Sequence, residues 1–372
     1  MKTKSINTSL NDRITAFAKA SSLLSSYLEG SLKALTNDGV SWHDRIQQRL
    51  ELAQRKNSWF TDDTLEFAIT QWAEALNEEN LTIWMQNYPL DKVTAKNIAL
   101  ITAGNLPLVG FHDVLSVIIV GHHAMIKNSS NDDVLTPLLL EIATSFCADL
   151  ASSYSYVDGK LENYDAVIAT GSNNTARYFE HYFGEKPNII RKNRNSVAVL
   201  TGNETLEQME ALSKDVFLYF GLGCRSVSHL KVPKGYNFDL FFNGMFVQKG
   251  LIKNEKYLNN YDYNKAVYLM SEFDLLDNEF LLIKEENSSY SSPIASLGYS
   301  FYEHIEDLAV EFEQNADQLQ CVVAQGAAAA TVIEKLGGKN APQIVDFGTT
   351  QTPGLQDYAD GVDTIQFLLT LS

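Results

Sequence analysis

The chain has 372 residues, of which 45% are hydrophobic and 20% are charged, an ordinary composition for a soluble globular protein. Its 29 Lys and Arg residues against 46 Asp and Glu residues give a formal net charge of −17. Such a charge repels phosphate backbones, so it argues against a nucleic-acid partner and against an anionic membrane surface.

Three cysteines, Cys147, Cys224 and Cys321, are odd in number and far apart. This spacing excludes a disulfide framework and a zinc pattern, so we expect no metal site and a reducing cytoplasmic compartment. The first residues are too polar for a secretory signal. The most apolar stretch, Val114–Val120, is much shorter than the roughly 20 residues that cross a bilayer, so we expect no membrane span.

Residues 1–92 have the periodicity of helices. Apolar side chains recur at helical spacing over Asp12–Leu28 and Trp42–Leu52. Asp63 and Glu66 are placed to cap a third helix that continues through Ala75. We therefore predict a helical N-terminal region.

From Asn97 onward, short apolar runs alternate with helix-length segments. This alternation predicts a parallel sheet covered by helices on both faces. The predicted strands are Asn97–Ala103, His123–Lys127, Tyr164–Thr170, Asn188–Arg191 and Val197–Thr201, and the predicted helices are Val109–Val120, Val134–Leu150 and Thr175–Phe183.

A second α/β region follows. A helix over Glu204–Phe220 leads to the Cys224 loop, and the later predicted elements are Val227–Val232, Ile305–Ala316, Leu319–Ala324, Ala327–Leu336 (ended by Gly337-Gly338) and Ile344–Phe347. The predicted organisation is a helical region over 1–92, a nucleotide-binding α/β domain over 93–220, a catalytic α/β domain over 221–347 and a tail over 348–372.

Three segments of the first sheet carry polar residues at strand ends. Asn105, Lys127 and Gly171-Ser172 all follow or end predicted strands. Ligands of parallel sheets bind beyond the carboxyl ends of the strands, so these residues indicate one binding edge. Gly171-Ser172 suits a phosphate at a helix N-terminus, and Lys127 suits a ribose. The alternatives are an ordinary turn and a solvated lysine.

Cys224 lies in a predicted loop, where Gly221 and Gly223 precede it and Arg225 follows it. Glycines free the backbone there, and an adjacent guanidinium favours the thiolate, so Cys224 is a candidate nucleophile. The alternative is a small buried apolar residue, which is our expectation for Cys147 and Cys321. Asn105 is a candidate oxyanion donor together with the Cys224 backbone N–H, or else an Asx turn before Pro107.

These segments, in this order, resemble the acyl-CoA reductase branch of the aldehyde dehydrogenase superfamily, typified by the reductase component of the bacterial luminescence fatty acid reductase. The similar segments are Gly104-Asn105-Leu106-Pro107, Met125-Ile126-Lys127-Asn128-Ser129-Ser130, Ala169-Thr170-Gly171-Ser172, Gly221-Leu222-Gly223-Cys224, Asn57-Ser58-Trp59-Phe60-Thr61 and Asp360-Gly361-Val362-Asp363-Thr364. The resemblance covers most of the chain from Asn57.

The resemblance implies an aldehyde-dehydrogenase-like α/β fold with a Rossmann-type cofactor domain and a second catalytic domain. It implies reduction of a fatty acyl-CoA or acyl-protein thioester to an aldehyde through an acyl-cysteine. Cys224 and Asn105 would then be catalytic, with CoA as the leaving group. The implied residues for a nicotinamide cofactor are Lys127, Ser129, Ser130, Gly171 and Ser172.

Three departures from the superfamily pattern refine that expectation. Oxidising members carry a water-activating Glu where this chain has Ile190–Arg194, which has no carboxylate, and Leu336-Gly337-Gly338-Lys339 comes too late to replace it. Ser130 stands where many NAD-preferring members have a Glu, which favours NADPH, with NADH as the alternative. No nicotinamide-ribose segment is recognisable near Ser292-Pro293.

Other functions remain open at this stage. The alternatives are an acyl phosphate reductase, an aldehyde oxidiser on the same fold, and a non-catalytic acyl-binding subunit. The resemblance also suggests an acyl-activating synthetase as a protein partner. The aromatic segments Phe238–Phe242 and Met245-Phe246 either line an acyl channel or, as we favour, pack in a core. Acyl length and oligomeric state do not follow from the sequence.

Overall fold

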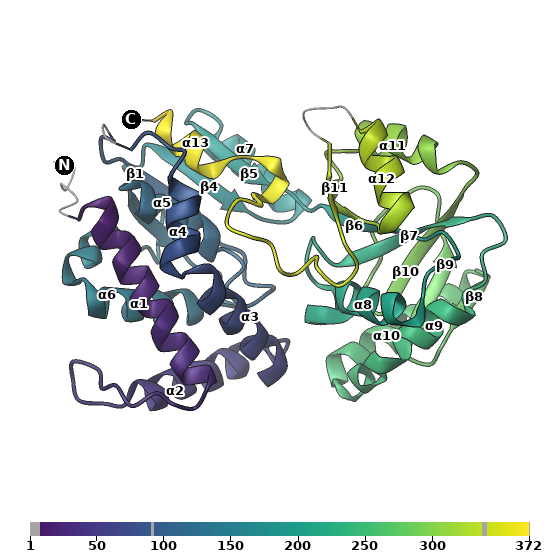
Figure 1. Cartoon of the computed structure of the whole chain (residues 1–372), viewed down its shortest axis with the longest axis horizontal. Coiled ribbons are helices and arrows are strands. Elements are labelled where there is room, and N and C mark those ends of the chain that lie inside the picture. Colours follow the sequence, from purple (N-terminus) through teal and green to yellow (C-terminus); the bar gives the residue numbers. More distant parts are fainter. Residues whose placement is uncertain (1–7, 91–92, 337–340, 372) are drawn as a thin grey trace. The chain divides into compact units, whose positions relative to one another are not determined.

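A computed structural model describes residues 8–90, 93–336 and 341–371. The chain forms two compact units (Figure 1). The first contains Met1–Lys192, Gly354–Tyr358 and Val362–Ser372, and the second contains Asn193–Pro353 and Ala359–Gly361. The predicted helix stop at Gly337-Gly338 lies outside the described residues.

Four helices open the first unit: α1 (Leu10–Leu28), α2 (Trp42–Lys56), α3 (Asp62–Ala75) and α4 (Glu78–Met85). The predicted cap of α3 by Asp63 and Glu66 is wrong. Thr61 is the N-cap, and its hydroxyl accepts from the Thr64 N–H while the Thr64 hydroxyl accepts from the Thr61 N–H. These two reciprocal hydrogen bonds satisfy backbone N–H groups at the start of the helix, which a carboxylate would satisfy in the predicted cap.

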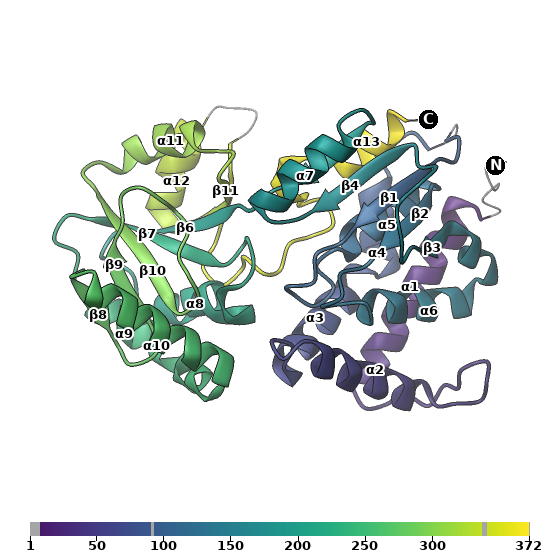
Figure 2. The ribbon, with the colours of Figure 1, turned by 180° about the vertical axis from the view of Figure 1, so that it is seen from behind.

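The first sheet has five parallel strands in the order β3-β2-β1-β4-β5 (Figure 2). Its strands are β1 (Asn97–Ile101), β2 (His123–Lys127), β3 (Tyr154–Tyr156), β4 (Ala166–Thr170) and β5 (Asn188–Arg191). The connecting elements are α5 (Phe111–Val120), α6 (Leu135–Phe146), η1 (Ala148–Ser153) and α7 (Asn173–Phe183), and α13 (Thr364–Leu369) packs on α5.

Alternate residues of these strands face two different layers. Ile98, Leu100 and Ile168 join the large core formed with α5 and the N-terminal helices. Ala99 and Val167 join a smaller core on the α7 side. Because both faces are buried, the strands read as continuous apolar runs, which is why the sequence revealed them.

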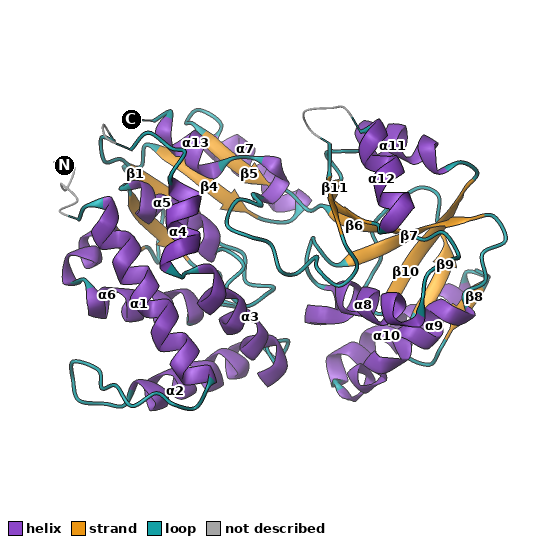
Figure 3. Cartoon of the chain, viewed as in Figure 1, coloured by secondary structure: helices purple, strands orange, loops and turns teal. Residues whose placement is uncertain are grey.

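The second sheet has seven strands in the order β12-β11-β6-β7-β10-β9-β8 (Figure 3). Only the pairing of β8 with β9 is antiparallel among the described pairs. The strands are β6 (Asn195–Val199), β7 (Val227–Pro233), β8 (Leu275–Asp277), β9 (Leu282–Glu285), β10 (Ser296–Tyr302), β11 (Leu319–Val323) and β12 (Gln343–Val345).

Helices cover both faces of this sheet. Helices α11 (Ile305–Gln314) and α12 (Gly326–Lys335) lie on one side, where they bury Val197, Val199 and Val322 (Figure 1). The other side carries α8 (Leu206–Phe217), α9 (Asp239–Met245) and α10 (Glu255–Met270), with the short turns η2 (Leu218–Gly221) and η3 (Phe246–Lys253).

The predicted domain boundary at residue 220 differs from the structure. β6 pairs with β7 and β11, so residues from Asn193 onward belong to the second unit. The 348–372 tail is also divided, because Gly354–Tyr358 and Val362–Ser372 lie in the first unit. A parallel strand pairs with whichever neighbour its crossover places beside it, and the strand–helix pattern alone does not reveal that neighbour.

Candidate active site

The three segments that were predicted to form a binding edge end or follow neighbouring strands of the first sheet. Asn105 follows β1, Lys127 ends β2, and Gly171-Ser172 follow β4. Strands β2, β1 and β4 are adjacent and parallel, so all three segments lie at the carboxyl edge of the sheet. At this edge α/β sheets bind their ligands.

The loop after β1 fits tightly against the loop after β2. A Cβ on Gly104 would lie 2.8 Å from the Ser129 Cβ and 2.9 Å from the Asp132 backbone nitrogen. Asn57 donates from its side-chain amide to the Gly104 carbonyl over 3.1 Å. Only glycine permits this approach without displacing backbone, so the turn that carries the exposed Asn105 is held in one place.

Asp132 secures the far side of the same turn. Its carboxylate accepts from the Leu108 N–H over 3.0 Å and from the Leu135 N–H over 3.1 Å. Burial raises the pKa of Asp132. Leu108 has a left-handed backbone, with φ of 58°, which a leucine adopts only where surrounding contacts require it.

Ser172 is the N-cap of the 11-residue helix α7. Its hydroxyl accepts from the Thr175 N–H over 3.3 Å, and a Cβ on Gly171 would lie 3.0 Å from both Phe179 and Thr175. The first turn of α7 therefore presents N–H groups beside an exposed hydroxyl, an arrangement suited to phosphate oxygens.

The β2 end supplies further polar groups. Lys127 donates to the Gly159 carbonyl over 2.8 Å, and the hydroxyl of the half-buried Ser129 accepts from the Asn131 N–H over 3.3 Å. Ser130 is exposed, and the buried Asn128 Oδ1 has no hydrogen-bond partner. The β2 end therefore carries an ammonium group, two hydroxyls and an amide oxygen near the close glycine approach at Gly104.

In the second unit, the Cys224 loop precedes β7 and therefore lies at the amino end of that strand. It follows η2, where Tyr219 and Phe220 both have left-handed backbones, with φ of 56° and 58°, and Gly221 has φ of 74°. Two consecutive bulky residues in this region are strained. Their side chains are buried, so packing holds the strained turn four residues before the cysteine.

Hydrogen bonds fix both ends of the cysteine loop. The fully buried Ser196 of β6 donates from its hydroxyl to the Cys224 carbonyl over 2.9 Å. The Ser226 N–H donates to the Gly223 carbonyl over 3.0 Å and closes a turn around Cys224. Because a trans peptide sets C=O and N–H in opposite directions, this bond turns the Cys224 N–H away from the Ser226 N–H.

The three cysteines differ in exposure. Cys224 is exposed, Cys147 is half-buried at the C-cap of α6, and Cys321 of β11 is buried. Burial raises the pKa of Cys321 to about 11, so its thiol stays protonated. The burial predicted for Cys321 is confirmed, whereas Cys147 lies beyond the helix end and is only partly covered.

The C-terminal segment of the second unit reaches the residues that follow Cys224. Arg225 extends its guanidinium toward the Thr350 carbonyl and the Gln343 amide oxygen, each at 3.4 Å. Gln351 donates to the Ser226 hydroxyl over 3.2 Å. The cationic group next to Cys224 is thereby oriented from two directions.

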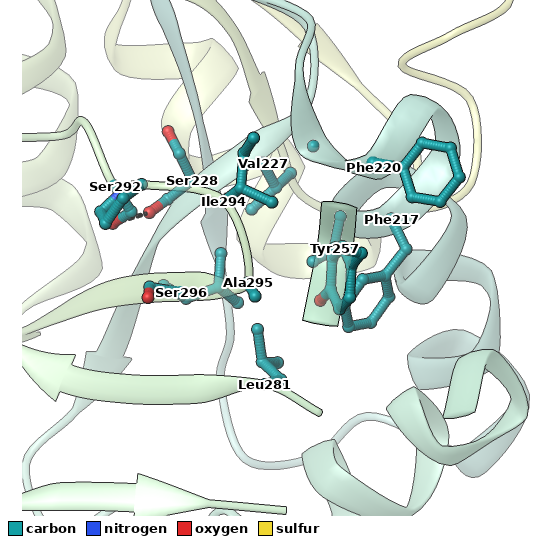
Figure 4. A pocket seen from close by; sticks show the side chains of 14 residues that line it. Phe217, Phe220, Val227, Ser228, Tyr257, Leu281, Ser292, Ile294, Ala295 and Ser296 are labelled. Carbon is teal, nitrogen blue, oxygen red and sulfur yellow. Dashed lines mark hydrogen bonds between the residues drawn. The ribbon is translucent and has the colours of Figure 1, made fainter. Parts of the chain in front are cut away.

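A small pocket lies beside the η2 turn (Figure 4). Its apolar walls come from Phe217 and Phe220 before the cysteine, Val227 after it, Tyr257 of α10 and the Ile294-Ala295 loop. The side chain of Ser292 donates to the Ser228 carbonyl over 2.8 Å at the polar end. By contrast, Phe238 packs against Phe241 and Tyr299, and Phe241 and Met245 are fully buried, as predicted for a core. The predicted core role of Phe246 is wrong, because its side chain is exposed.

Residues 190–194, which lack the superfamily's carboxylate, include two arginines that form ion pairs. Arg191 is buried and pairs with Asp113 over 2.7 Å, while also donating to the Thr364 hydroxyl. Arg194 pairs with Asp360 over 3.2 Å. His229 of β7 is buried, and desolvation lowers its pKa to about 3. It bonds Ser300 over 2.9 Å and therefore stays neutral.

Residues 83–239, less than half of the chain, match the family described as acyl-CoA reductase (LuxC). The predicted resemblance to that branch is confirmed. No curated protein is a significant match. The family match and the fold together support an oxidoreductase of the aldehyde dehydrogenase type.

Solved structures confirm the predicted fold class. Aldehyde dehydrogenase 21 from Physcomitrella patens is 12% identical with a TM-score of 0.69, covering 99% of this chain and 85% of that one. The NAD-dependent benzaldehyde dehydrogenase from Corynebacterium glutamicum is also 12% identical, with a TM-score of 0.66 and coverage of 98% and 84%. The P. syringae indole-3-acetaldehyde dehydrogenase, solved with NAD+, is 15% identical with a TM-score of 0.64 and coverage of 92% and 77%.

Sequence reasoning missed several polar residues that hold the cysteine loop. Ser196 lies within the apolar strand β6, and Asp215 and Thr350 are buried although neither is in a recognisable motif. A polar residue inside an apolar run was the only signal for Ser196. Within the described residues, no helix is long and apolar enough to cross a membrane, and no cluster of three metal-ligating side chains occurs.

Proposed function

We propose that this protein reduces an acyl thioester, a fatty acyl-CoA or an acyl-protein, to an aldehyde, with Cys224 as the nucleophile. One observation carries the proposal. The exposed cysteine of a chain that matches the acyl-CoA reductase family follows a strained turn, and hydrogen bonds from Ser196 and Ser226 hold the backbone of its loop. Nucleophilic cysteines are found in such exposed, cation-bearing loops.

In the first half-reaction, the Cys224 thiolate attacks the thioester carbonyl. We assign the oxyanion to the Cys224 backbone N–H and, on the family resemblance alone, to the side-chain amide of Asn105, which belongs to the other unit. Collapse breaks the bond from carbon to the CoA sulfur, and the CoA thiolate leaves and takes up a proton. The acyl group remains on the Cys224 sulfur as a thioester, so no net oxidation has occurred.

A nicotinamide cofactor, when bound, would supply the hydride to the acyl carbon. The bond from that carbon to the Cys224 sulfur then breaks, which releases the aldehyde and restores the Cys224 thiolate. Ser172, Gly171 and the N-terminus of α7 would hold its phosphates, and Lys127, Ser129 and Ser130 its adenosine end. Ser130 places no carboxylate at the β2 end, which leaves room for a 2′-phosphate and supports NADPH over NADH. Two of the similar structures, both of indole-3-acetaldehyde dehydrogenases, were solved with NAD+.

The sequence of residues 190–194 supports transfer of the acyl group rather than its hydrolysis. Residues 190–194 hold no carboxylate, and Arg191 is itself committed to Asp113. Without a base to activate water, an acyl-cysteine is exchanged with a thiol or reduced, and is not hydrolysed. This favours the reductase over the aldehyde oxidiser.

The second candidate is an acyl phosphate reductase, because the same cysteine chemistry accepts a phosphate leaving group. A non-catalytic acyl-binding subunit is a third, and the exposed Cys224 disfavours it. We also propose that an acyl-activating synthetase delivers the acyl group, since the proposed reaction consumes an activated acyl donor.

The decisive experiment measures NADPH oxidation with long-chain acyl-CoA for the wild type and Cys224→Ala, with Cys147→Ser as the matched thiol control. Turnover in the wild type and in Cys147→Ser, and none in Cys224→Ala, supports the proposal. Turnover with acyl phosphate alone supports the second candidate. Equal rates in the wild type and Cys224→Ala remove Cys224 from the mechanism.

A further inference from the structure

Asp215 is a buried carboxylate with an unusual set of partners. It lies on α8, is 1% exposed, and accepts from the Thr350 N–H over 3.0 Å and from the Thr350 hydroxyl over 2.9 Å. The Gly348 N–H donates to its other oxygen. A buried carboxylate is costly unless it is hydrogen-bonded, and these three donors all come from one short segment.

That segment, residues 348–351, depends on α8 for its conformation. Gly348 has a left-handed φ of +83°, and a Cβ there would lie 3.2 Å from the Ala211 Cβ. Thr350 is fully buried. The segment therefore follows the helix surface closely, and Asp215 supplies its polar attachment.

The same segment contacts the two residues that follow Cys224. The Thr350 carbonyl faces the Arg225 guanidinium at 3.4 Å, and the Gln351 amide donates to the Ser226 hydroxyl at 3.2 Å. The charges of Asp215 and Arg225 both act on the pKa of the buried Cys321 thiol, as does Cys224. All of these groups lie in the second unit and surround one thiol-containing region.

We infer that Asp215 is a positioning residue for Cys224, acting through the 348–351 segment on Arg225 and Ser226. Asp215 fixes the Thr350 carbonyl, which holds the Arg225 guanidinium where it stabilises the Cys224 thiolate. This inference rests on the proposed role of Cys224 as the nucleophile. It predicts an effect on the thiol itself, before any substrate binds.

Removing the Asp215 charge has two opposite effects on Cys224. The negative charge of Asp215 disfavours the Cys224 thiolate, so loss of that charge by itself would lower the pKa of the Cys224 thiol. Loss of positioning releases Arg225 and raises the pKa of that thiol. The direction of the change therefore distinguishes a positioning residue from a nearby charge.

The test is alkylation of Cys224 by iodoacetamide over a pH series, without substrate or cofactor, with each site quantified by peptide mass spectrometry. For Asp215→Asn we expect the midpoint to move upward, by up to about one pH unit, so that the rate at neutral pH falls up to about tenfold. An unchanged or lowered midpoint would overturn the inference.

Two further comparisons keep the test decisive. In an Arg225→Ala background only the charge effect of Asp215 remains, so Asp215→Asn should leave the midpoint in place or lower it slightly, whereas an upward shift like that in the wild-type background contradicts the route through Arg225. If Asp215→Asn does not fold, Thr350→Val replaces it, with Thr350→Ser as the matched variant that keeps the hydroxyl. We expect an upward shift for valine only, and equal midpoints for the two would overturn the inference.

Acyl-CoA turnover is measured on the same variants. If the wild type fails to turn over acyl-CoA while the alkylation midpoints shift as expected, the proposed substrate is wrong and the positioning role stands. If turnover occurs but Asp215→Asn leaves the midpoint in place, the proposed function stands and the positioning role is wrong.

Discussion

The two sheets of this protein hold their candidate residues in different ways. In the five-stranded sheet, Asn105, Lys127 and Ser172 lie at the carboxyl edge, where strand ends and a helix N-terminus supply backbone donors. In the seven-stranded sheet, Cys224 lies at the amino end of β7, and buried side chains from β6, α8 and the 348–351 segment hold its loop.

The difference shows what each chemistry requires. Phosphates and ribose are bound by backbone N–H groups and small residues, which the geometry of a parallel α/β sheet provides at one predictable edge. A reactive thiolate needs a loop held in an uncommon conformation beside a cation, and side-chain contacts must supply that restraint. Substitutions in the two regions should therefore have different consequences.

Asn105→Ala should have the largest effect on activity. Losing one oxyanion donor costs about 10²–10³ in kcat, or roughly 3–4 kcal/mol, without changing stability. Steady-state kinetics with acyl-CoA measure the loss, and Asn203→Ala, another exposed asparagine, is the control. A kcat for Asn105→Ala within about threefold of wild type would remove Asn105 from the mechanism.

The Cys224 region should also make stability depend on pH through Asp215. Burial raises the pKa of Asp215 from 3.8 to about 6. Between these values the unfolded carboxyl ionises while the native one stays protonated, so the free energy of unfolding falls by about 3 kcal/mol as pH rises and is constant above pH 6. Urea unfolding from pH 4 to 7 should show this slope in the wild type and not in Asp215→Asn. Identical slopes would contradict the assignment.

Gly104→Ala should disturb the carboxyl edge of the first sheet. The added Cβ would meet the Ser129 Cβ and the Asp132 backbone nitrogen, so backbone must shift, at a cost of about 1–3 kcal/mol. Gly159→Ala is the matched control, because nothing lies within 4 Å of a Cβ there. Urea unfolding and NADPH titration measure both effects, and equal behaviour of the two variants would show that the edge is not tightly packed.

Ser172 allows helix capping and cofactor binding to be separated. Ser172→Ala removes the α7 cap and should cost about 1 kcal/mol of stability. Ser172→Asp restores the cap but places a negative charge beside the proposed phosphate site, so stability should recover while NADPH binding weakens further. If Ser172→Asp binds NADPH like the wild type, the phosphate does not lie at this helix.

The sequence predicted the first sheet and its edge more fully than the second. Strands β2 and β5 match their predicted bounds, because a strand buried on both faces is a distinct apolar run. Helix α10 was missed because tyrosines and Asn264 form its buried face, so its apolar periodicity is weak. Strand β9 follows the polar residues Asp277–Glu279 and strand β10 follows a serine-rich segment, and both were also missed.

The candidate site shows the same limit. Cys224, Asn105 and Ser172 were recognisable because each stands in a short local motif. Ser196, Asp215 and Thr350 hold the cysteine loop through contacts between residues at least 28 positions apart in the chain. Such contacts depend on which strands become neighbours in the sheet, and the spacing of residues within one segment does not determine those neighbours.

In the proposed mechanism Cys224 carries the acyl group. Its most direct test is to incubate the protein with a long-chain acyl-CoA in the absence of nicotinamide cofactor and to map any adduct by mass spectrometry. We predict one acyl group per chain, on the Cys224 peptide, with one equivalent of CoA released and the adduct lost when NADPH is added. An unmodified Cys224, or an acyl group on Cys147 instead, would contradict the account.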